Sequence, residues 1–175
     1  MTVTGVDDDL IDGTITSTTT ISVNDAASDN NFDGVADQTV SVSTTDDDVA
    51  GFTIVELDGS TTVTEAGGTD TFTVVLNAQP SSNVVLSISS SDTGEATVTS
   101  LITFTSANWD TPQNVTVTGV DDNIIDGTQD SNLTLSIVSA ITDDDFDGVA
   151  DQTVSVSTTD DDVAGFTVSE PDGST

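Results

Sequence analysis

The sequence predicts an all-β fold, an immunoglobulin-like antiparallel β-sandwich of about seven strands that is repeated in tandem. Val, Ile and Phe alternate with Ser and Thr over most of the chain, and a period of two is typical of β-strands. Turn-forming clusters such as DGS, AGG, AQPSS and SDTGE separate the alternating segments. Residues 32–53 also recur without change as residues 146–167, each numbered 114 higher than its counterpart.

This repeat sets the domain boundaries. TVTGVDD at residues 2–8 recurs at residues 116–122 with the same offset, so one complete unit spans residues 49–162. Residues 1–48 match the C-terminal part of a unit, and residues 163–175 match the first strand of the next one. The incomplete first piece fits either part of a longer polypeptide or a repeat completed by strands from a neighbouring chain.

Each expected strand of the complete unit is an alternating run bounded by turn residues. The first, FTIVE, continues after LDGS into TTVTE, and TFTVVLN follows the glycines of AGG. NVVLSIS lies between AQPSS and SDTGE, ATVT continues into ITFT after a short break, and NVTVTGV follows NWDTPQ. LTLSIV and TVSVST flank an acidic loop. The expected ranges are 52–56 with 61–65, 71–77, 83–89, 96–99 with 102–105, 114–120, 133–138 and 153–158.

The apolar positions of these strands predict a thin core, since the chain has only six Phe, one Trp and no Tyr. The residues expected to point inward are Phe72, Val74, Leu76, Val85, Ile88, Phe104, Val115, Val117, Leu133, Leu135, Ile137, Val154 and Val156.

The charge of the chain limits its partners. It carries 32 Asp and Glu residues and no Lys, Arg or His, so its formal charge is −32. Nucleic acids and anionic membranes are excluded as partners because nothing here neutralises phosphate. The 34% hydrophobic content and the strong patterning favour folding, but the like charges require cations. Without Cys or Lys, neither disulfides nor Lys-to-Asn isopeptide bonds can form, so bound metal ions are the remaining means of cross-linking the fold.

The composition also bears on catalysis and location. With no His, Cys, Lys or Arg, only acid pairs remain for catalysis, and their spacing is that of metal ligands, so we expect no enzyme. No run of about 18 apolar residues is present for direct membrane insertion. MTVTGVDDD lacks the basic and apolar parts of a signal peptide, so an export signal would lie outside this chain.

The acidic loop occurs in both copies with the pattern D-x-D-x-D-G-x-x-D or a close variant. Oxygen ligands at positions one, three, five, seven and nine, with Gly at six, are typical of EF-hand-type Ca²⁺ loops. The Glu that such loops have at position twelve is missing, and the alternative is a solvated acidic turn. The predicted ligands are Asp143, Asp145, Asp147, Val149 and Asp151, and in the other copy Asp29, Asn31, Asp33, Val35 and Asp37.

A second set of carboxylates follows the expected strands. Asp160, Asp161 and Asp162 close the last strand, Asp121 and Asp122 follow VTVTGV, and Asp126 lies in the next turn. Alternate loops of a sandwich gather at one end, where these residues can converge. When carboxylates lie so close to one another, their mutual repulsion prevents all of them from staying ionised without a metal. Bound Ca²⁺ removes this repulsion.

Three segments, TVTEAGGTDTFTVVLNAQP, LITFTSANWDTPQNVTVTGVDDNIIDG and VSVSTTDDD, span essentially the whole unit and resemble the Calx-β domain family. In particular, the unit resembles the tandem Calx-β-like repeats of large secreted bacterial surface and adhesin proteins. The resemblance implies a seven-stranded sandwich with several calcium ions at one end. Asp126 departs from the pattern, since the family often has Glu there, and the acidic loop is an addition to it. The ligands implied are Glu65, Asp92, Asp121, Asp122, Asp126, Asp160, Asp161 and Asp162, and in the other copy Asp7, Asp8, Asp12, Asp46, Asp47 and Asp48.

Together these features predict a calcium-stabilised structural repeat, an extender of an extracellular surface protein, adhesin or filament. Only residues 163–165 separate DDD from the next strand at Phe166, so calcium at DDD would stiffen the junction. The expected partners are neighbouring repeats and, in a filament or surface layer, other copies of the chain. The alternative is a calcium-dependent glycan-binding or adhesion module acting through metal or Trp109. Trp109 equally fits a residue that caps the sandwich or packs beside Pro112.

Overall fold

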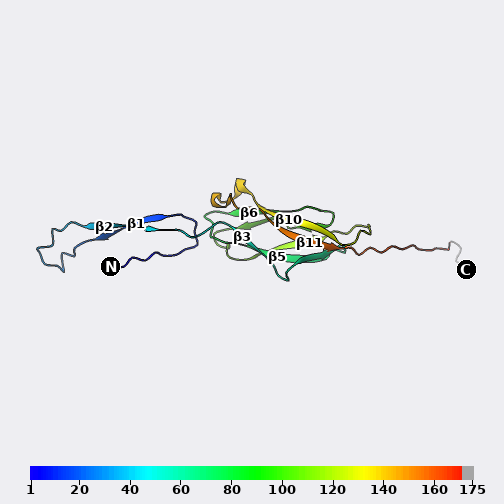
Figure 1. Ribbon diagram of the computed structural model, residues 1–175, viewed down its shortest axis with the longest axis horizontal. Coiled ribbons are helices and arrows are strands. Elements are labelled where there is room, and N and C mark those ends of the chain that lie inside the picture. The colour runs from blue at the N-terminus through cyan, green and yellow to red at the C-terminus, as the bar shows by residue number, and fades with distance from the viewer. Residues whose placement is uncertain (171–175) are drawn as a thin grey trace. The chain divides into compact units, whose positions relative to one another are not determined.

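The computed structural model describes residues 1–170, so the last five residues of the expected next strand, 171–175, lie outside the described part. The chain forms two compact units, Met1–Val49 (unit 1) and Ala50–Thr175 (unit 2) (Figure 1). The described residues contain no helix with the length and apolar character needed to cross a membrane.

Unit 2 is a β-sandwich, which confirms the predicted all-β fold class. One sheet has the strand order β4-β11-β10-β6-β8 and the other the order β3-β5-β9-β7. Two short 3-10 turns, η1 (Ser139–Ile141) and η2 (Asp144–Phe146), lie between the last two strands. The strands are β3 (Phe52–Glu56), β4 (Thr61–Thr64), β5 (Thr69–Leu76), β6 (Val84–Ser90), β7 (Ala96–Val98), β8 (Leu101–Phe104), β9 (Gln113–Gly119), β10 (Gln129–Ile137) and β11 (Gln152–Thr159).

Two of the seven expected strands are each divided between the sheets. β3 and β4 are the two parts of the first expected strand, and β7 and β8 are the two parts of the fourth. A turn at Gly59, whose φ is +86°, takes the chain from the sheet of β3 to the sheet of β4. β4 then runs parallel to β11, with Thr61 opposite Val156, which departs from the expected antiparallel arrangement.

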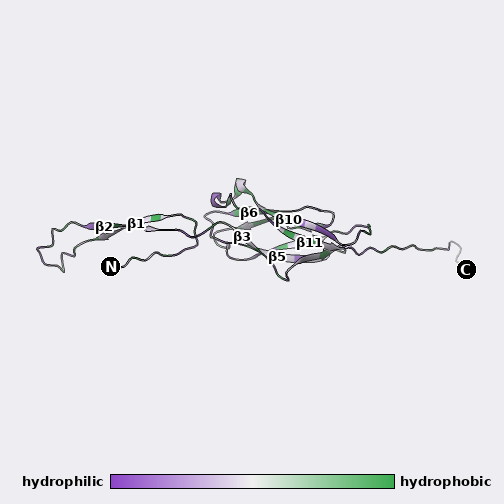
Figure 2. Ribbon diagram, in the orientation of Figure 1, coloured by the Kyte–Doolittle hydropathy of each residue, from purple (hydrophilic) through white to green (hydrophobic). Residues whose placement is uncertain are grey.

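The alternating apolar residues of both sheets form the core, and Figure 2 shows these apolar stretches along the strands. All of the predicted inward residues are buried except Ile137, which is half-buried at the end of β10. In β6 the buried alternation is Val84, Leu86 and Ile88, so Val85 lies on the opposite face. Val85 is 8% exposed, and its amide donates to the Thr142 hydroxyl at 3.1 Å. The core also contains residues that were not predicted, namely Phe52, Val63, Ala78, Val84, Leu86, Ala96, Ile102 and Phe146.

Unit 1 contains an antiparallel hairpin of β1 (Ile15–Ile21) and β2 (Gln38–Thr44). By the repeat offset, these strands correspond to β10 and β11. Phe32 and Val40 are 58% and 48% exposed, whereas their counterparts Phe146 and Val154 are 0% and 4% exposed. The same sequence is therefore packed into a core in unit 2 and largely solvated in unit 1.

Candidate metal centre

The ends of β4 and β11 bring acidic residues together in unit 2. Because these strands are parallel, with Thr64 opposite Thr159, the residues that follow them leave the sheet at the same edge. Those residues are Glu65 and Asp160. The Glu65 amide donates to the Thr159 carbonyl at 3.1 Å, which extends the pairing by one step. The parallel pair therefore positions Glu65 beside the DDD segment.

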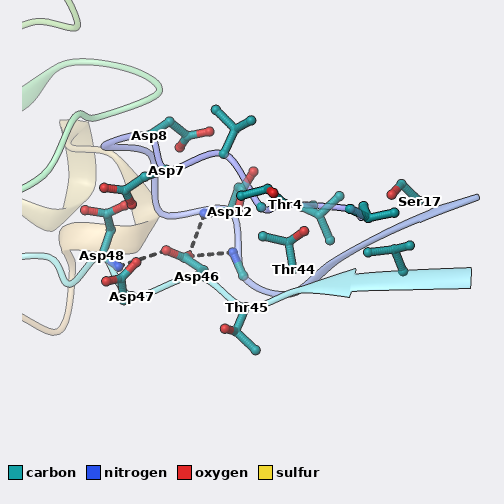
Figure 3. A pocket seen from close by; sticks show the side chains of 16 residues that line it. Thr4, Asp7, Asp8, Asp12, Ser17, Thr44, Thr45, Asp46, Asp47 and Asp48 are labelled. Atoms are coloured by element: carbon teal, nitrogen blue, oxygen red, sulfur yellow. Dashed lines mark hydrogen bonds between the residues drawn. The ribbon is translucent and has the colours of Figure 1, made fainter. Parts of the chain in front are cut away.

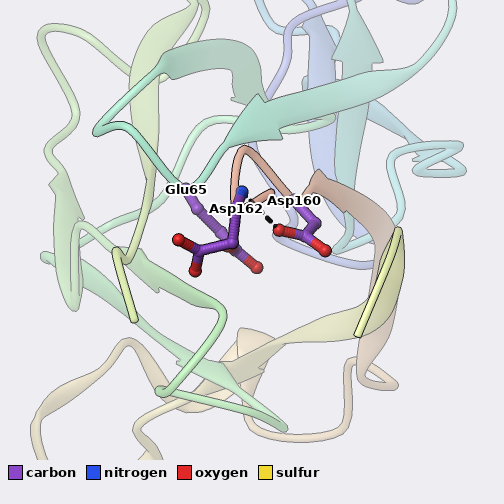
Figure 4. A group of neighbouring side chains, drawn as sticks. All are labelled: Glu65, Asp160 and Asp162. Carbon is purple, nitrogen blue, oxygen red and sulfur yellow. Dashed lines mark hydrogen bonds between the residues drawn. The ribbon is translucent and has the colours of Figure 1, made fainter. Parts of the chain in front are cut away.

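Glu65, Asp160 and Asp162 offer carboxylate oxygens that all lie within 4.8 Å of one another (Figure 4). Ca²⁺ binds oxygens at about 2.3–2.6 Å, so two oxygens on one ion are separated by up to about 5 Å. The Asp162 amide donates to Asp160 at 2.7 Å, and this turn brings both residues to the cluster while Asp161 stays exposed. Within the described part of the chain, this is the acidic group whose geometry suits one ion.

Burial makes the cluster unfavourable without a cation. Glu65 is 1% exposed, and neither of its carboxylate oxygens has a hydrogen-bond partner among the described residues. Burial, followed by the charges of neighbouring carboxylates, of which Asp160 has the largest effect, raises the pKa of Glu65 to about 7. Asp162 also has a buried oxygen without a partner, and burial and the charge of Asp160 raise its pKa. Buried oxygens are normally satisfied, so these fit the role of cation ligands.

Glu95 belongs to the same region, although it was not predicted as a ligand. It is 9% exposed, its Oε2 atom is buried without a partner, and burial followed by the charge of Asp126 raises its pKa. Asp92, which the resemblance implied for this loop, is exposed and accepts from the Gly94 amide at 2.9 Å. The available sequence signal was position, because Glu95 directly precedes the alternating run that begins at Ala96.

The loop after β9 supplies the remaining predicted carboxylates. Asp121 and Asp126 are exposed and Asp122 is half-buried. The Asp122 carboxylate accepts from the Ile124 amide at 2.6 Å. The charges of Asp122 and Asp126 contribute to the raised pKa of Glu65, so both carboxylates lie in its surroundings.

Two glycines shape this end of the sandwich. A Cβ atom on Gly119 would collide with the Thr64 carbonyl oxygen, so only glycine lets β9 end against the residue before Glu65. Gly127, with φ of +73°, donates its amide to Asp160 at 2.8 Å. The hydrogen bonds to Asp160, first the one from Gly127, lower the pKa of Asp160.

Unit 1 reproduces the DDD half of this arrangement. Asp46, the counterpart of Asp160, accepts from the amides of Gly13 at 2.7 Å, Asp12 at 3.0 Å and Asp48 at 2.9 Å (Figure 3). Residues 1–49 include no counterpart of Glu65. The predicted residues Asp7, Asp8, Asp12, Asp46, Asp47 and Asp48 all line one pocket of unit 1.

The acidic loop of unit 2 lies at the other end of β11, where serine side chains contact its first aspartate. The Asp143 carboxylate is 4% exposed and accepts from the Ser82 amide at 2.6 Å and the Ser81 hydroxyl at 2.7 Å. Burial raises the pKa of Asp143, but the hydrogen bonds it accepts outweigh burial and lower the pKa overall. Phe146, which is 0% exposed, anchors η2 in the core.

Among the described residues, the carboxylates of this loop do not form a group of three whose oxygens lie within 4.8 Å of one another. Asp145, Asp147 and Asp151 are exposed and Val149 is half-buried, while Asp143 is held by the serines. Ser81 and Ser82 donate hydrogen bonds to Asp143, and local spacing cannot reveal this long-range contact. In unit 1, Asp29, Asn31, Asp33, Val35 and Asp37 are all exposed. Calcium at either loop stays a prediction.

Trp109 lies in the loop between β8 and β9 and is half-buried. Its carbonyl accepts from the amide of Leu76, the last residue of β5, at 3.1 Å. Because Thr69, at the other end of β5, pairs with Thr118 near the carboxylate cluster, Trp109 lies at the opposite end of the sandwich.

The fold and the site define unit 2 as a β-sandwich with buried carboxylates at one end. The chain is similar to the apo-form CBD1 domain of Calx, with 18% identity, a TM-score of 0.47 and coverage of 66% of this chain and 100% of that one. It is similar to the calcium binding domain CBD12 of CALX1.1, with 18% identity, a TM-score of 0.45 and coverage of 65% and 48%. Domains 4 and 5 of the S-layer protein SbsC match at 22% identity, a TM-score of 0.45 and coverage of 72% and 54%. No protein-family model and no curated protein matches the chain.

Proposed function

We propose that unit 2 is a calcium-stabilised structural repeat, an extender segment of an extracellular surface protein, adhesin or filament. The observation that carries this proposal is Glu65, a buried carboxylate with two unpartnered oxygens beside Asp160 and Asp162. A chain with no Lys, Arg or His has no cationic side chain to place there. Ca²⁺, which favours carboxylate oxygens, supplies the missing positive charge.

Glu65, Asp160 and Asp162 are the residues we expect to hold the ion. Ca²⁺ takes about six to eight oxygen ligands, so further oxygens are needed. Glu95, Asp122 and Asp126, whose charges also raise the pKa of Glu65, are the candidates. A ligand that binds only the folded state stabilises it in proportion to the logarithm of its concentration. Calcium therefore acts as a structural cofactor that sets the stability of the sandwich.

The same ion would fix the segment that leaves the domain. Asp160 directly follows β11, so calcium shared by Glu65 and Asp162 ties the DDD segment to the end of β4. Only residues 163–165 then separate this anchor from the FTV that begins the next copy of the repeat. A tether this short has little freedom, so a calcium-loaded array is expected to behave as a semi-rigid rod.

Thermal unfolding of the whole chain in saturating calcium and in EDTA tests the proposal. Glu65→Gln removes the buried ligand charge, and Asp110→Asn removes an exposed carboxylate near Trp109 as a matched control. We expect calcium to raise the melting temperature of the wild type and of Asp110→Asn, and to have little effect on Glu65→Gln. A wild-type melting curve that is the same with calcium and with EDTA would overturn the proposal.

A further inference from the structure

The outer face of the four-stranded sheet is uncharged, although the chain carries a formal charge of −32. The outward residues are those that alternate with the buried positions of β3, β5, β9 and β7. The two carboxylates within these strands occupy inward positions near strand ends, where Glu56 accepts from the Thr61 hydroxyl at 2.8 Å and Asp70 from the Thr62 amide at 2.8 Å. The outward set, termed the threonine face, comprises Thr53, Val55, Thr69, Thr71, Thr73, Val75, Thr97, Asn114, Thr116 and Thr118, together with Thr99, which directly follows β7 and donates its amide to the Thr116 carbonyl.

The threonines of this face are in register on neighbouring strands. Thr71 pairs with Thr116, and Thr118 lies between Thr69 on β5 and Thr97 on β7. They form a grid with a spacing of about 4.8 Å across strands and roughly 6.7 Å along them. Within the described residues, the hydroxyls of Thr71, Thr116 and Thr118 make no hydrogen bond to protein. These hydroxyls remain available to a partner.

The outer face of the five-stranded sheet is different. Asp130, at the start of β10, is exposed on it. At the other end, the segment that includes η1 and η2 covers the start of β6, where Val85 is only 8% exposed, and carries the exposed Asp144 and Asp145. Carboxylates therefore lie at both ends of this face, whereas the outward positions of β3, β5, β9 and β7 carry none.

We propose that the threonine face packs laterally against the same face of a second copy of this chain. Two copies that each carry a formal charge of −32 repel one another, and the repulsion is least where no carboxylates face each other. A hydroxyl both donates and accepts hydrogen bonds, so two threonine faces are self-complementary about a twofold axis. Two sheets with the same twist also pack face to face at about −30°.

The size of the face determines the strength of pairing. The four strands β3, β5, β9 and β7 have 5, 8, 7 and 3 residues, and with about 4.8 Å between strands and about 3.3 Å per residue they cover roughly 360 Å². A stable interface buries about 800 Å² per partner, so a pair of single units is expected to associate weakly. Successive repeats along an array add further contacts at high effective concentration. Lateral pairing is thus weak for one unit and cumulative for an array.

This inference goes beyond the proposed calcium function and does not depend on which residues hold the ion. Sedimentation equilibrium of the whole chain in saturating calcium, over a wide concentration range, measures the association. Thr116→Asp places a charge at the centre of the threonine face, and Ser155→Asp places one on the opposite sheet as a matched control. We expect Thr116→Asp to lower the association constant by about tenfold or more, because like charges then oppose each other, and Ser155→Asp to change it little.

A second measurement covers the case in which the fold does not tolerate the Thr116→Asp substitution. The chain has no cysteine, so Thr116→Cys and Ser155→Cys each introduce a single thiol. We expect disulfide-linked dimers to form faster with Thr116→Cys. Lateral pairing would be overturned if the Thr116 variants and the matching Ser155 variants had equal effects. It would also be overturned if the wild type stayed monomeric while calcium still raised its melting temperature. Either result would leave the calcium proposal standing. A wild type without association and without a calcium response would overturn both.

Discussion

Replacing Phe146 tests whether the acidic loop of unit 2 is a core-anchored structural element. Phe146 is 0% exposed, and its amide donates to the Asp143 carbonyl at 3.0 Å. Phe146→Ala removes a fully buried ring and leaves a cavity, a change that typically costs about 3–5 kcal/mol. In a domain of this size, 1 kcal/mol corresponds to several degrees, so we expect the melting temperature to fall by about 10 °C or more.

Phe32→Ala is the matched control, because Phe32 occupies the same position in an identical stretch of sequence but is 58% exposed. An exposed substitution of this kind changes stability by about 0.5 kcal/mol or less. Urea unfolding and thermal melting, both followed by circular dichroism in saturating calcium, give the two values. Equal losses for Phe146→Ala and Phe32→Ala would refute the reasoning, since packing would then not distinguish the two copies.

The two ends of unit 2 allow three further tests. Asp143→Ala leaves the serine donors of Ser81 and Ser82 without their acceptor, and we expect urea unfolding to show a loss of about 1–3 kcal/mol, while Asp147→Ala, at an exposed position, is nearly neutral. Gly119→Ala drives a Cβ into the Thr64 carbonyl oxygen and displaces Glu65, so calorimetry should show a calcium affinity that is reduced about tenfold or more. Gly148→Ala is the control, because a Cβ added there meets no other atom within 4 Å, and this variant should bind calcium as the wild type does. In EDTA, the native Glu65 pKa of about 7 exceeds its ordinary 4.5, so the folded state holds this proton more tightly and stability should fall as pH rises from 4.5 to about 7. Glu65→Gln should flatten that pH dependence, and an unchanged slope would count against the assignment.

The sandwich could be predicted because its strands alternate simply, as in Val154 and Val156 of β11, which are 4% and 0% exposed. The division of the first strand could not, because LDGS resembles a turn within one continuing strand. The passage of the chain from the sheet of β3 to the sheet of β4 depends on Phe52 packing in the first sheet and Val63 in the second. Both side chains are 3% exposed. The parallel pairing of β4 with β11 joins segments far apart in sequence, and no local pattern encodes it.

For the site, too, sequence patterns reveal some residues, whereas contacts between residues far apart in the chain cannot be predicted from them. The resemblance to a family pointed to Glu65, Asp160 and Asp162, and the structure brings these three together. Spacing alone predicts Asp143 as a metal ligand, which stays a prediction, and it gives no sign of the hydrogen bond from Ser81, which lies 62 residues earlier in the chain. Glu95 was missed because the nearby Asp92 matched the expected loop position, whereas burial at the start of β7 distinguishes Glu95.

The position of calcium in crystals of the whole chain, grown with Ca²⁺ and examined by anomalous scattering, tests the central proposal most directly. We predict an ion about 2.3–2.6 Å from carboxylate oxygens of Glu65 and Asp162, with Asp160 in the same coordination shell. Crystals from saturating calcium in which Glu65 remains buried with no ion beside it would contradict the proposal.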